Sequence, residues 1–171
     1  MALLSAASFA EWERERRLAL HGSLDEVQAL PPGPRLAVLA LRQAQPVFLL
    51  RDGTPPELVA AAVRSGLADR DALEAIELGD VAQLAEARAS GLVLAAGLPS
   101  GFRVGFVRER GGWRVDLPAS LDSVGRVVSQ TARATGASED AVIVSLIATA
   151  SGRPVGKDVW SPLLREKTSA Q

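Results

Sequence analysis

The first third of the chain alternates apolar stretches at helical spacing with residues that begin or end helices. A Ser or Thr followed three residues later by Glu is typical of a helix start, because each side chain accepts a hydrogen bond from a backbone amide of the first turn. This pattern occurs at Ser8 with Glu11, Ser23 with Glu26, and Thr54 with Glu57. We therefore predict helices over about 9–21, 24–30, 34–45 and 55–66.

The segment 34–45 has the clearest apolar stripe of the four. Leu36, Val38, Leu39 and Leu41 are spaced so that they share a broad helix face, and Pro46 ends the pattern. We expect this helix to be buried. Its polar side chains are predicted to reach solvent, namely Arg35, Arg42 and Gln43.

The period changes to two in the middle of the chain, where residues 102–117 predict a β-hairpin. Gly111 and Gly112 can supply the positive φ angles of a two-residue turn. That turn sets Phe106 opposite Leu117 and Glu109 opposite Arg114. It places one set of apolar residues on a single face, namely Phe102, Val104, Phe106, Trp113, Val115 and Leu117.

Two strands alone are marginally stable in water, so the hairpin needs a larger sheet to join. The segments 76–83 and 85–94 can supply two further strands. A competing interpretation makes 80–89 a helix that Asp80 caps and Gly91 ends. We favour the strands.

After Pro118 the helical period returns. We predict helices near 120–135 and 139–151, ended by Gly136 and Gly152, and a tail that docks through Val159, Trp160 and Leu163. The second helix is so apolar that it should pack on two sides. The predicted fold is α+β, with N-terminal helices, a small antiparallel sheet and two C-terminal helices. We assign one domain over 1–171, divided into a helical part (1–66), the sheet (73–118) and the C-terminal helices with their tail (119–165).

The composition indicates where the protein occurs more clearly than what it does. The chain of 171 residues carries 19 basic and 20 acidic side chains, so no net field favours nucleic acid or an anionic membrane. The apolar stretches are too short to span a bilayer, and the first ten residues lack the positive region of a secretory signal. The abundance of Arg over Lys is common in GC-rich bacterial genomes. We expect a soluble, cytoplasmic, bacterial protein.

The sequence contains few residues or motifs that are typical of catalytic or metal-binding sites. The chain has no Cys, and its one His, His21, sits where it complements the end of a helix. The Gly152–Lys157 segment lacks the spacing of a phosphate-binding loop. The acidic pairs Asp69 with Asp71 and Glu139 with Asp140 lie at predicted helix starts. We therefore predict no catalytic residue, no metal site and no cofactor, although enzymatic activity stays open because carboxylates that meet in space leave no sequence spacing.

The hairpin offers the best candidate binding residues. Arg103, Arg108, Arg110 and Arg114 can form a basic patch beside Trp113, and Trp160 is a second large side chain that can anchor an interface. The alternative is that the arginines form a solvated hairpin tip, that Arg108 is partly buried with a carboxylate, and that Trp160 belongs to the core.

The segments Ile76–Val81 and Phe106–Leu117, with the Ala-rich run between them, resemble the sheet of nuclear transport factor two-like domains. The Gly-Gly-Trp-basic-hydrophobic-Asp phrase after the hairpin turn carries this resemblance. It implies a curved sheet that wraps helices into a cone. That superfamily includes enzymes, scaffolds, toxin-neutralising proteins and ligand binders, so the resemblance implies a fold and no single function.

The sequence has clear patterns for helices and strands but no catalytic motif. We therefore favour a non-catalytic protein-binding module. A bacterial accessory or toxin-neutralising (immunity) protein is one such module, its partner being another protein or a second copy of the chain in a homodimer. The alternative is a small-molecule-binding protein or a carboxylate-dependent enzyme with a pocket between the sheet and the helices.

Overall fold

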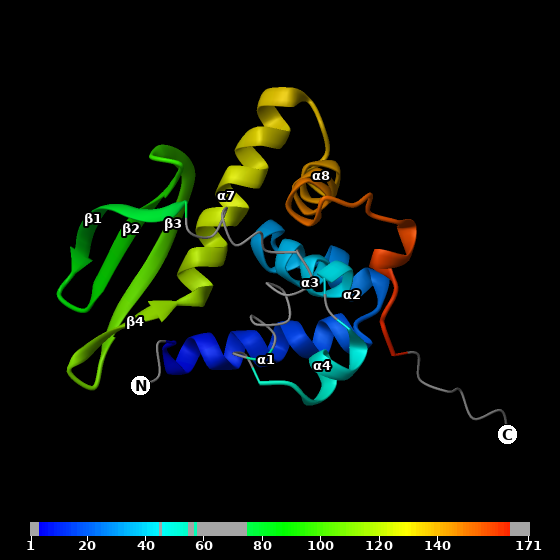
Figure 1. Cartoon of the computed structure of the whole chain (residues 1–171), viewed down its shortest axis with the longest axis horizontal. Coiled ribbons are helices and arrows are strands. Elements are labelled where there is room, and N and C mark those ends of the chain that lie inside the picture. The colour runs from blue at the N-terminus through cyan, green and yellow to red at the C-terminus, as the bar shows by residue number, and fades with distance from the viewer. Residues whose placement is uncertain (1–3, 45, 55–56, 58–74, 165–171) are drawn as a thin grey trace, which may run out of the picture.

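The computed structural model describes residues 4–44, 46–54, 57 and 75–164. A four-stranded sheet lies on one side of a long helix, α7 (Leu117–Thr135), and most of the other helices lie on its other side (Figure 1). Helix α7 joins the two parts, because it packs on strand β3 (Leu98–Glu109) and on helices α3 (Pro32–Ala44) and α8 (Glu139–Ser151). The predicted α+β class is confirmed.

Helix α1 (Ala6–His21) begins earlier than the sequence pattern suggested. Ser5 is its N-cap. Ser8 lies inside the helix and is buried, where its hydroxyl donates to the carbonyl of Val115 (2.7 Å) and accepts from the amide of Leu117 (2.7 Å). The predicted cap at Ser8 is therefore wrong, because hydrogen bonds to a distant strand end occupy that hydroxyl.

The next helices follow the sequence more closely. Helix α2 (Leu24–Gln28) has the predicted reciprocal cap between Ser23 and Glu26. A short helix that we did not predict, α4 (Val47–Asp52), follows α3. The helix predicted over 55–66 and the pair Asp69–Asp71 lie outside the described residues, apart from Glu57, whose carboxylate accepts from the amide of Thr54 (2.7 Å).

The sheet consists of four antiparallel strands in the order β1-β2-β3-β4. Strands β1 (Ile76–Ala85) and β2 (Arg88–Ala95) precede β3, and β4 (Gly112–Asp116) follows it. The strand interpretation of this region is confirmed and the helix over 80–89 is wrong, because β1 and β2 pair along their length and satisfy backbone groups that the helix would have paired internally.

The hairpin between β3 and β4 is present, but its register differs from the predicted one by two residues. Arg110 (φ 50°) and Gly111 (φ 78°) form the turn, so Phe106 pairs with Val115 and Arg108 with Trp113. A shift of two residues keeps Phe106, Trp113 and Val115 on one face as predicted, whereas Leu117 begins α7 and leaves the strand. The shift also breaks the predicted Glu109–Arg114 pair, and the carboxylate of Glu109 instead accepts from the amide of Ala6 (3.2 Å).

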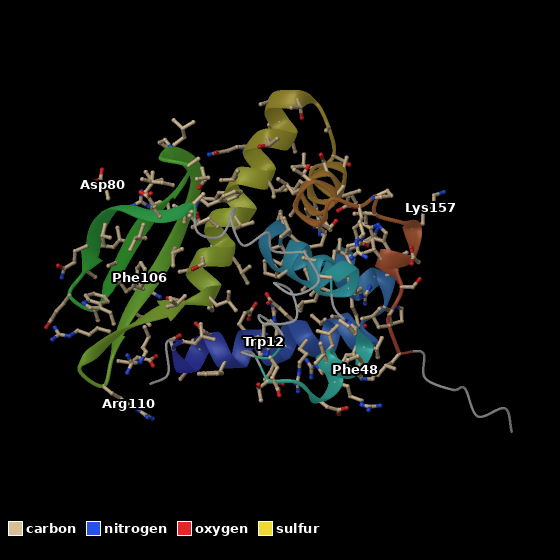
Figure 2. All side chains as sticks on the ribbon, in the orientation of Figure 1. Trp12, Phe48, Asp80, Phe106, Arg110 and Lys157 are labelled. Atoms are coloured by element: carbon tan, nitrogen blue, oxygen red, sulfur yellow. The ribbon has the colours of Figure 1, made fainter. Side chains whose placement is uncertain are left out.

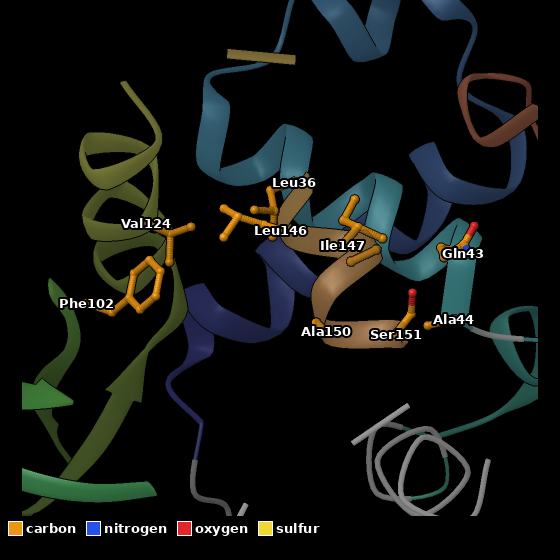
Figure 3. A pocket seen from close by; sticks show the side chains of 10 residues that line it. Leu36, Gln43, Ala44, Phe102, Val124, Leu146, Ile147, Ala150 and Ser151 are labelled. Carbon is orange, nitrogen blue, oxygen red and sulfur yellow. The ribbon is translucent and has the colours of Figure 1, made fainter. Parts of the chain in front are cut away.

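Phe102 leaves the face on which we had placed it. The β2–β3 register shifts between Leu92 and Leu94, and Gly101 in the opposing segment has a φ of 80°. Such a bulge re-aims the side chains beyond it. Phe102 therefore lies beside Val124 of α7, where it lines a cleft at the helices (Figure 3).

The predicted C-terminal elements are confirmed, with α7 beginning at Leu117 under an Asp116 cap and α8 covering the predicted range. The tail forms a short 3₁₀ helix, η1 (Lys157–Trp160), and the amide of Leu164 bonds to the carbonyl of Leu20 (2.8 Å). Ile143 is fully buried, and α8 packs on α3 and α7. Its central role in the core is thus confirmed.

Arg42 was predicted to reach solvent and is instead only 6% exposed. Its guanidinium donates to four carbonyl oxygens, those of Leu18, Ala19, Gly22 and Val159, at 2.6–3.2 Å. Burial lowers the pKa of Arg42. Three of these carbonyls belong to the end of α1, whose partial negative charge favours a cation. The sequence pattern missed this site because the acceptors lie far from Arg42 along the chain.

Candidate functional site

The sheet has two faces with different surroundings. In the middle of β3 the amide of Gly105 bonds to the Ser120 hydroxyl (3.0 Å), and a Cβ at Gly105 would lie 2.6 Å from the Cβ of Ala119. Gly105 therefore faces α7, and we call this side the inner face. Because strand side chains alternate, Val104, Phe106 and Arg108 lie on the opposite side, the outer face.

The outer face carries an apolar patch. The pairing registers place residues of all four strands on it, and several of them are large and exposed. Ile76 is 50% exposed, Leu78 53%, Val81 55% and Trp113 44%. We define the outer apolar patch as Ile76, Leu78, Val81, Ala89, Phe106 and Trp113.

A groove of about 380 Å³ runs through this patch, lined by Leu78, Val81, Gln83, Ala89, Phe106 and Trp113. Small residues of β2 form its floor. A Cβ at Gly91 would clash with Cδ1 of Leu78 and lie 3.3 Å from Cε2 of Phe106, so these two side chains lean over the glycine. The groove is therefore built by small residues between two larger apolar rows.

Two of the predicted arginines flank the outer apolar patch. Arg108 pairs with Trp113 across the hairpin, lies on the outer face and is exposed, while Arg110 lies at the hairpin tip (Figure 2). Neither has a carboxylate within ion-pair distance among the described residues, so the predicted partly buried pair at Arg108 is not found. The patch therefore has a basic border at this end.

The structure does not bring the other predicted binding residues to this site. Arg114 pairs with Val107 and Arg103 pairs with Leu92, which puts both arginines on the inner face. Nη1 of Arg114 donates to the carbonyl of Trp113 (3.2 Å). Trp160 lies in η1 and packs against the helical core. The site thus consists of Trp113, Arg108 and Arg110 together with β1 residues that we had not singled out.

The two edges of the sheet are unequal. The free edge of β4 is occupied by the N-terminal segment, where Leu4 bridges to Val115 and the amide of Ser5 bonds to its carbonyl (3.0 Å). Strand β1 forms the other edge, but its pairing is broken by two register shifts, the first of them at Gly79–Asp80. Bulges and charges on an edge strand disfavour the addition of another strand. The face is therefore a better binding surface than the edge.

Several hollows lie on the helical side, and two of them adjoin the sheet. The cleft at Phe102 has a volume of about 350 Å³ and is lined by apolar side chains, with Gln43 and Ser151 at one end (Figure 3). A second, more polar hollow of about 290 Å³ lies between α7 and the inner face of β2.

The described residues hold little that resembles a catalytic centre. No group of three or more metal-ligating side chains occurs in them, and His21 is exposed at the end of α1. Glu139 and Asp140 begin α8, where Asp140 pairs with Arg35 and Glu139 accepts from the Ser129 hydroxyl (2.6 Å). None of the described helices is long and apolar enough to cross a membrane.

One carboxyl group has a strongly shifted pKa. Glu15 of α1 is 2% exposed, and its Oε1 has no hydrogen-bond partner among the described residues. Burial, with a smaller contribution from the charge of Glu11, raises the pKa of Glu15 to about 8. Glu15 does not line the groove or any of these hollows, so this perturbation alone assigns it no function.

Comparison with protein-family models, with curated proteins and with solved structures found no match to this chain. The functional argument therefore rests on the geometry of the molecule.

Proposed function

We propose that this chain is a non-catalytic protein-binding module that binds its partner through the outer apolar patch. The observation that supports this proposal most is the exposure of four large apolar side chains on one face, three of which are at least half exposed. Isolated exposed apolar residues are ordinary, whereas contiguous patches mark interaction sites on folded proteins.

The size of the face supports the same proposal. The eight residues of β2 span about 26 Å, and four strands span about 19 Å, which gives a face of roughly 500 Å². A standard interface buries about 800 Å² of accessible surface on each partner. The outer apolar patch with its border can therefore supply most of a small interface.

The border indicates the chemistry of the partner. Arg108 and Arg110 present guanidinium groups at one end of the groove. A partner with an apolar centre and carboxylates at the matching edge would be complementary to this surface, because opposite charges steer association and fix orientation. A cytoplasmic bacterial accessory or toxin-neutralising protein is the form of module that we propose, in keeping with the resemblance to nuclear transport factor two-like domains.

The proposal is tested with Trp113→Ser and Val81→Asp, both at exposed positions of the patch. Phe48→Ser is the matched control, because Phe48 is 62% exposed and lies in α4, away from the sheet (Figure 2). Each tagged protein is used to capture partners from the native organism, and any captured protein is purified and titrated by calorimetry. We expect one partner that binds the unmodified protein and the control and is lost with both patch variants.

Circular dichroism must show that the variants are folded. If the same partner binds all three variants with equal affinity, or if nothing is captured and the chain is a monomer in sedimentation, the outer apolar patch is not a binding surface. Self-association that the patch variants abolish would identify a second copy as the partner.

A further inference from the structure

The hollow between α7 and β2 has a charge pattern that the protein-binding proposal does not use. Helix α7 packs along β3 (Figure 1), and the hollow lies beside it, over the inner face of β2. Three arginines from three elements line this hollow, namely Arg88 of β2, Arg103 of β3 and Arg126 of α7. We call it the arginine groove.

Arg103 is held in place at the floor of this groove. Its Nε donates to the Ser90 hydroxyl (2.8 Å), and its Nη2 donates to the Ser90 carbonyl (2.9 Å). The amide of Arg103 in turn donates to the Ser123 hydroxyl of α7 (3.0 Å). The half-buried guanidinium is thus fixed before any ligand arrives, and its Nη1 has no protein partner among the described residues.

The arginines are not neutralised by the carboxylates around them. None of the three has an ion pair within the described part of the chain. Two carboxylates line the groove. Asp116 is buried and caps α7 by accepting from the amide of Ala119 (3.3 Å), and Asp122 is exposed. Three guanidinium groups against two carboxylates leave the lining positive.

We propose that the arginine groove binds a small organic anion that carries carboxylate or phosphate groups. The fork of a guanidinium matches both groups in geometry, and a partly desolvated site strengthens such hydrogen bonds. A volume of about 290 Å³ is at the lower end of ligand pockets, which favours a metabolite-sized molecule. Gly105 lines the same hollow, and its lack of a side chain lets α7 approach β3 closely there.

The test uses inorganic phosphate, pyrophosphate and citrate as separate probes, titrated into the full chain by calorimetry and by amide chemical shifts. Arg88→Ala and Arg126→Ala each remove an exposed guanidinium, and Arg103→Lys keeps the charge while losing the fork. Arg133→Ala is the matched control, since it removes an exposed arginine of α7 that does not line the groove. We expect at least one probe to bind, with shifts centred on Ser90 and Ser123.

Each of the three groove variants should then weaken that probe about tenfold or more, and the control should change it less than twofold. Preference for citrate or for a phosphate would identify which anionic group the ligand carries. Dissociation constants weaker than about 1 mM for all three probes, or equal weakening in the control, overturn the proposal. Because the groove is on the inner face, the outcome is independent of whether the outer apolar patch binds a protein.

Discussion

The buried carboxyl of Glu15 makes the stability of the protein depend on pH in a direction that can be measured. In the unfolded chain the Glu15 carboxyl ionises at its ordinary pKa of 4.5, whereas in the folded chain burial raises the pKa to about 8. Between these values the unfolded state has lost a proton that the folded state keeps. The free energy of unfolding therefore falls as the pH rises, by about 1.4 kcal/mol per pH unit.

At pH 7 this effect amounts to about 3 kcal/mol relative to pH 4.5, a large part of the stability of a single domain. Glu15→Gln has nearly the same shape and does not ionise. We expect it to be more stable than the unmodified protein at pH 7, by up to about 3 kcal/mol or roughly 6–12 °C in melting temperature. The difference should shrink to the intrinsic cost of the amide near pH 4.5.

The assay is urea unfolding followed by tryptophan fluorescence at several pH values from about 4 to 9, spanning both pKa values. Glu13→Gln is the matched control, because the Glu13 side chain lies on the same helix and is 55% exposed. Its stability profile should follow that of the unmodified protein. If Glu15→Gln also gives a parallel profile between pH 5 and 8, the carboxyl is not held protonated and the reasoning is refuted.

Four further substitutions and one treatment test the fold. Gly111→Val should cost more than about 1 kcal/mol in thermal unfolding because its φ is 78°, and Gly112→Val, at a position without a positive φ, should cost less; the reverse order would contradict the turn. Ile143→Ala should cost about 2–5 kcal/mol in urea unfolding, and equal stability would remove α8 from the core. Arg42→Ala should cost about 3 kcal/mol or more because four carbonyls lose their donor, so a small change would mean that water replaces the guanidinium. Chelators should leave the melting temperature unchanged, and a stoichiometric metal in the purified protein would contradict our prediction that the chain has no metal site.

Much of the fold was predictable because periodicity and glycine positions report local structure. The ends of α7 and α8 coincide with Gly136 and Gly152, both in the left-handed conformation. The hairpin register was not predictable from the same signals. Consecutive glycines allow two turns that differ by two residues in pairing, and both keep the apolar residues on one face. Contacts of Val115 with Ser5 and Ser8 accompany the observed register, and sequence spacing does not reveal them.

The candidate site was only half predictable for a related reason. Alternation shows which side of a strand is apolar, but not whether another element covers that side. Trp113 and Arg108 were singled out from the hairpin, whereas Leu78 and Val81 became candidates only when their exposure was known. The arginine groove escaped notice because Arg88, Arg103 and Arg126 meet only in three dimensions. The position of Arg126 along α7 does not reveal that β2 and β3 bring two more arginines next to it.

The four carbonyls around Arg42 also have a consequence for how the chain matures during synthesis. Three of them are made before Arg42 itself, but the fourth belongs to Val159, which follows more than a hundred residues later. Until that residue leaves the ribosome the guanidinium lacks one of its acceptors and the end of α1 lacks the tail that covers it. The Ser8 hydroxyl likewise has no acceptor at Val115 until that residue has been made. The N-terminal helices therefore lack part of their native packing until Val115 and Val159 have been made.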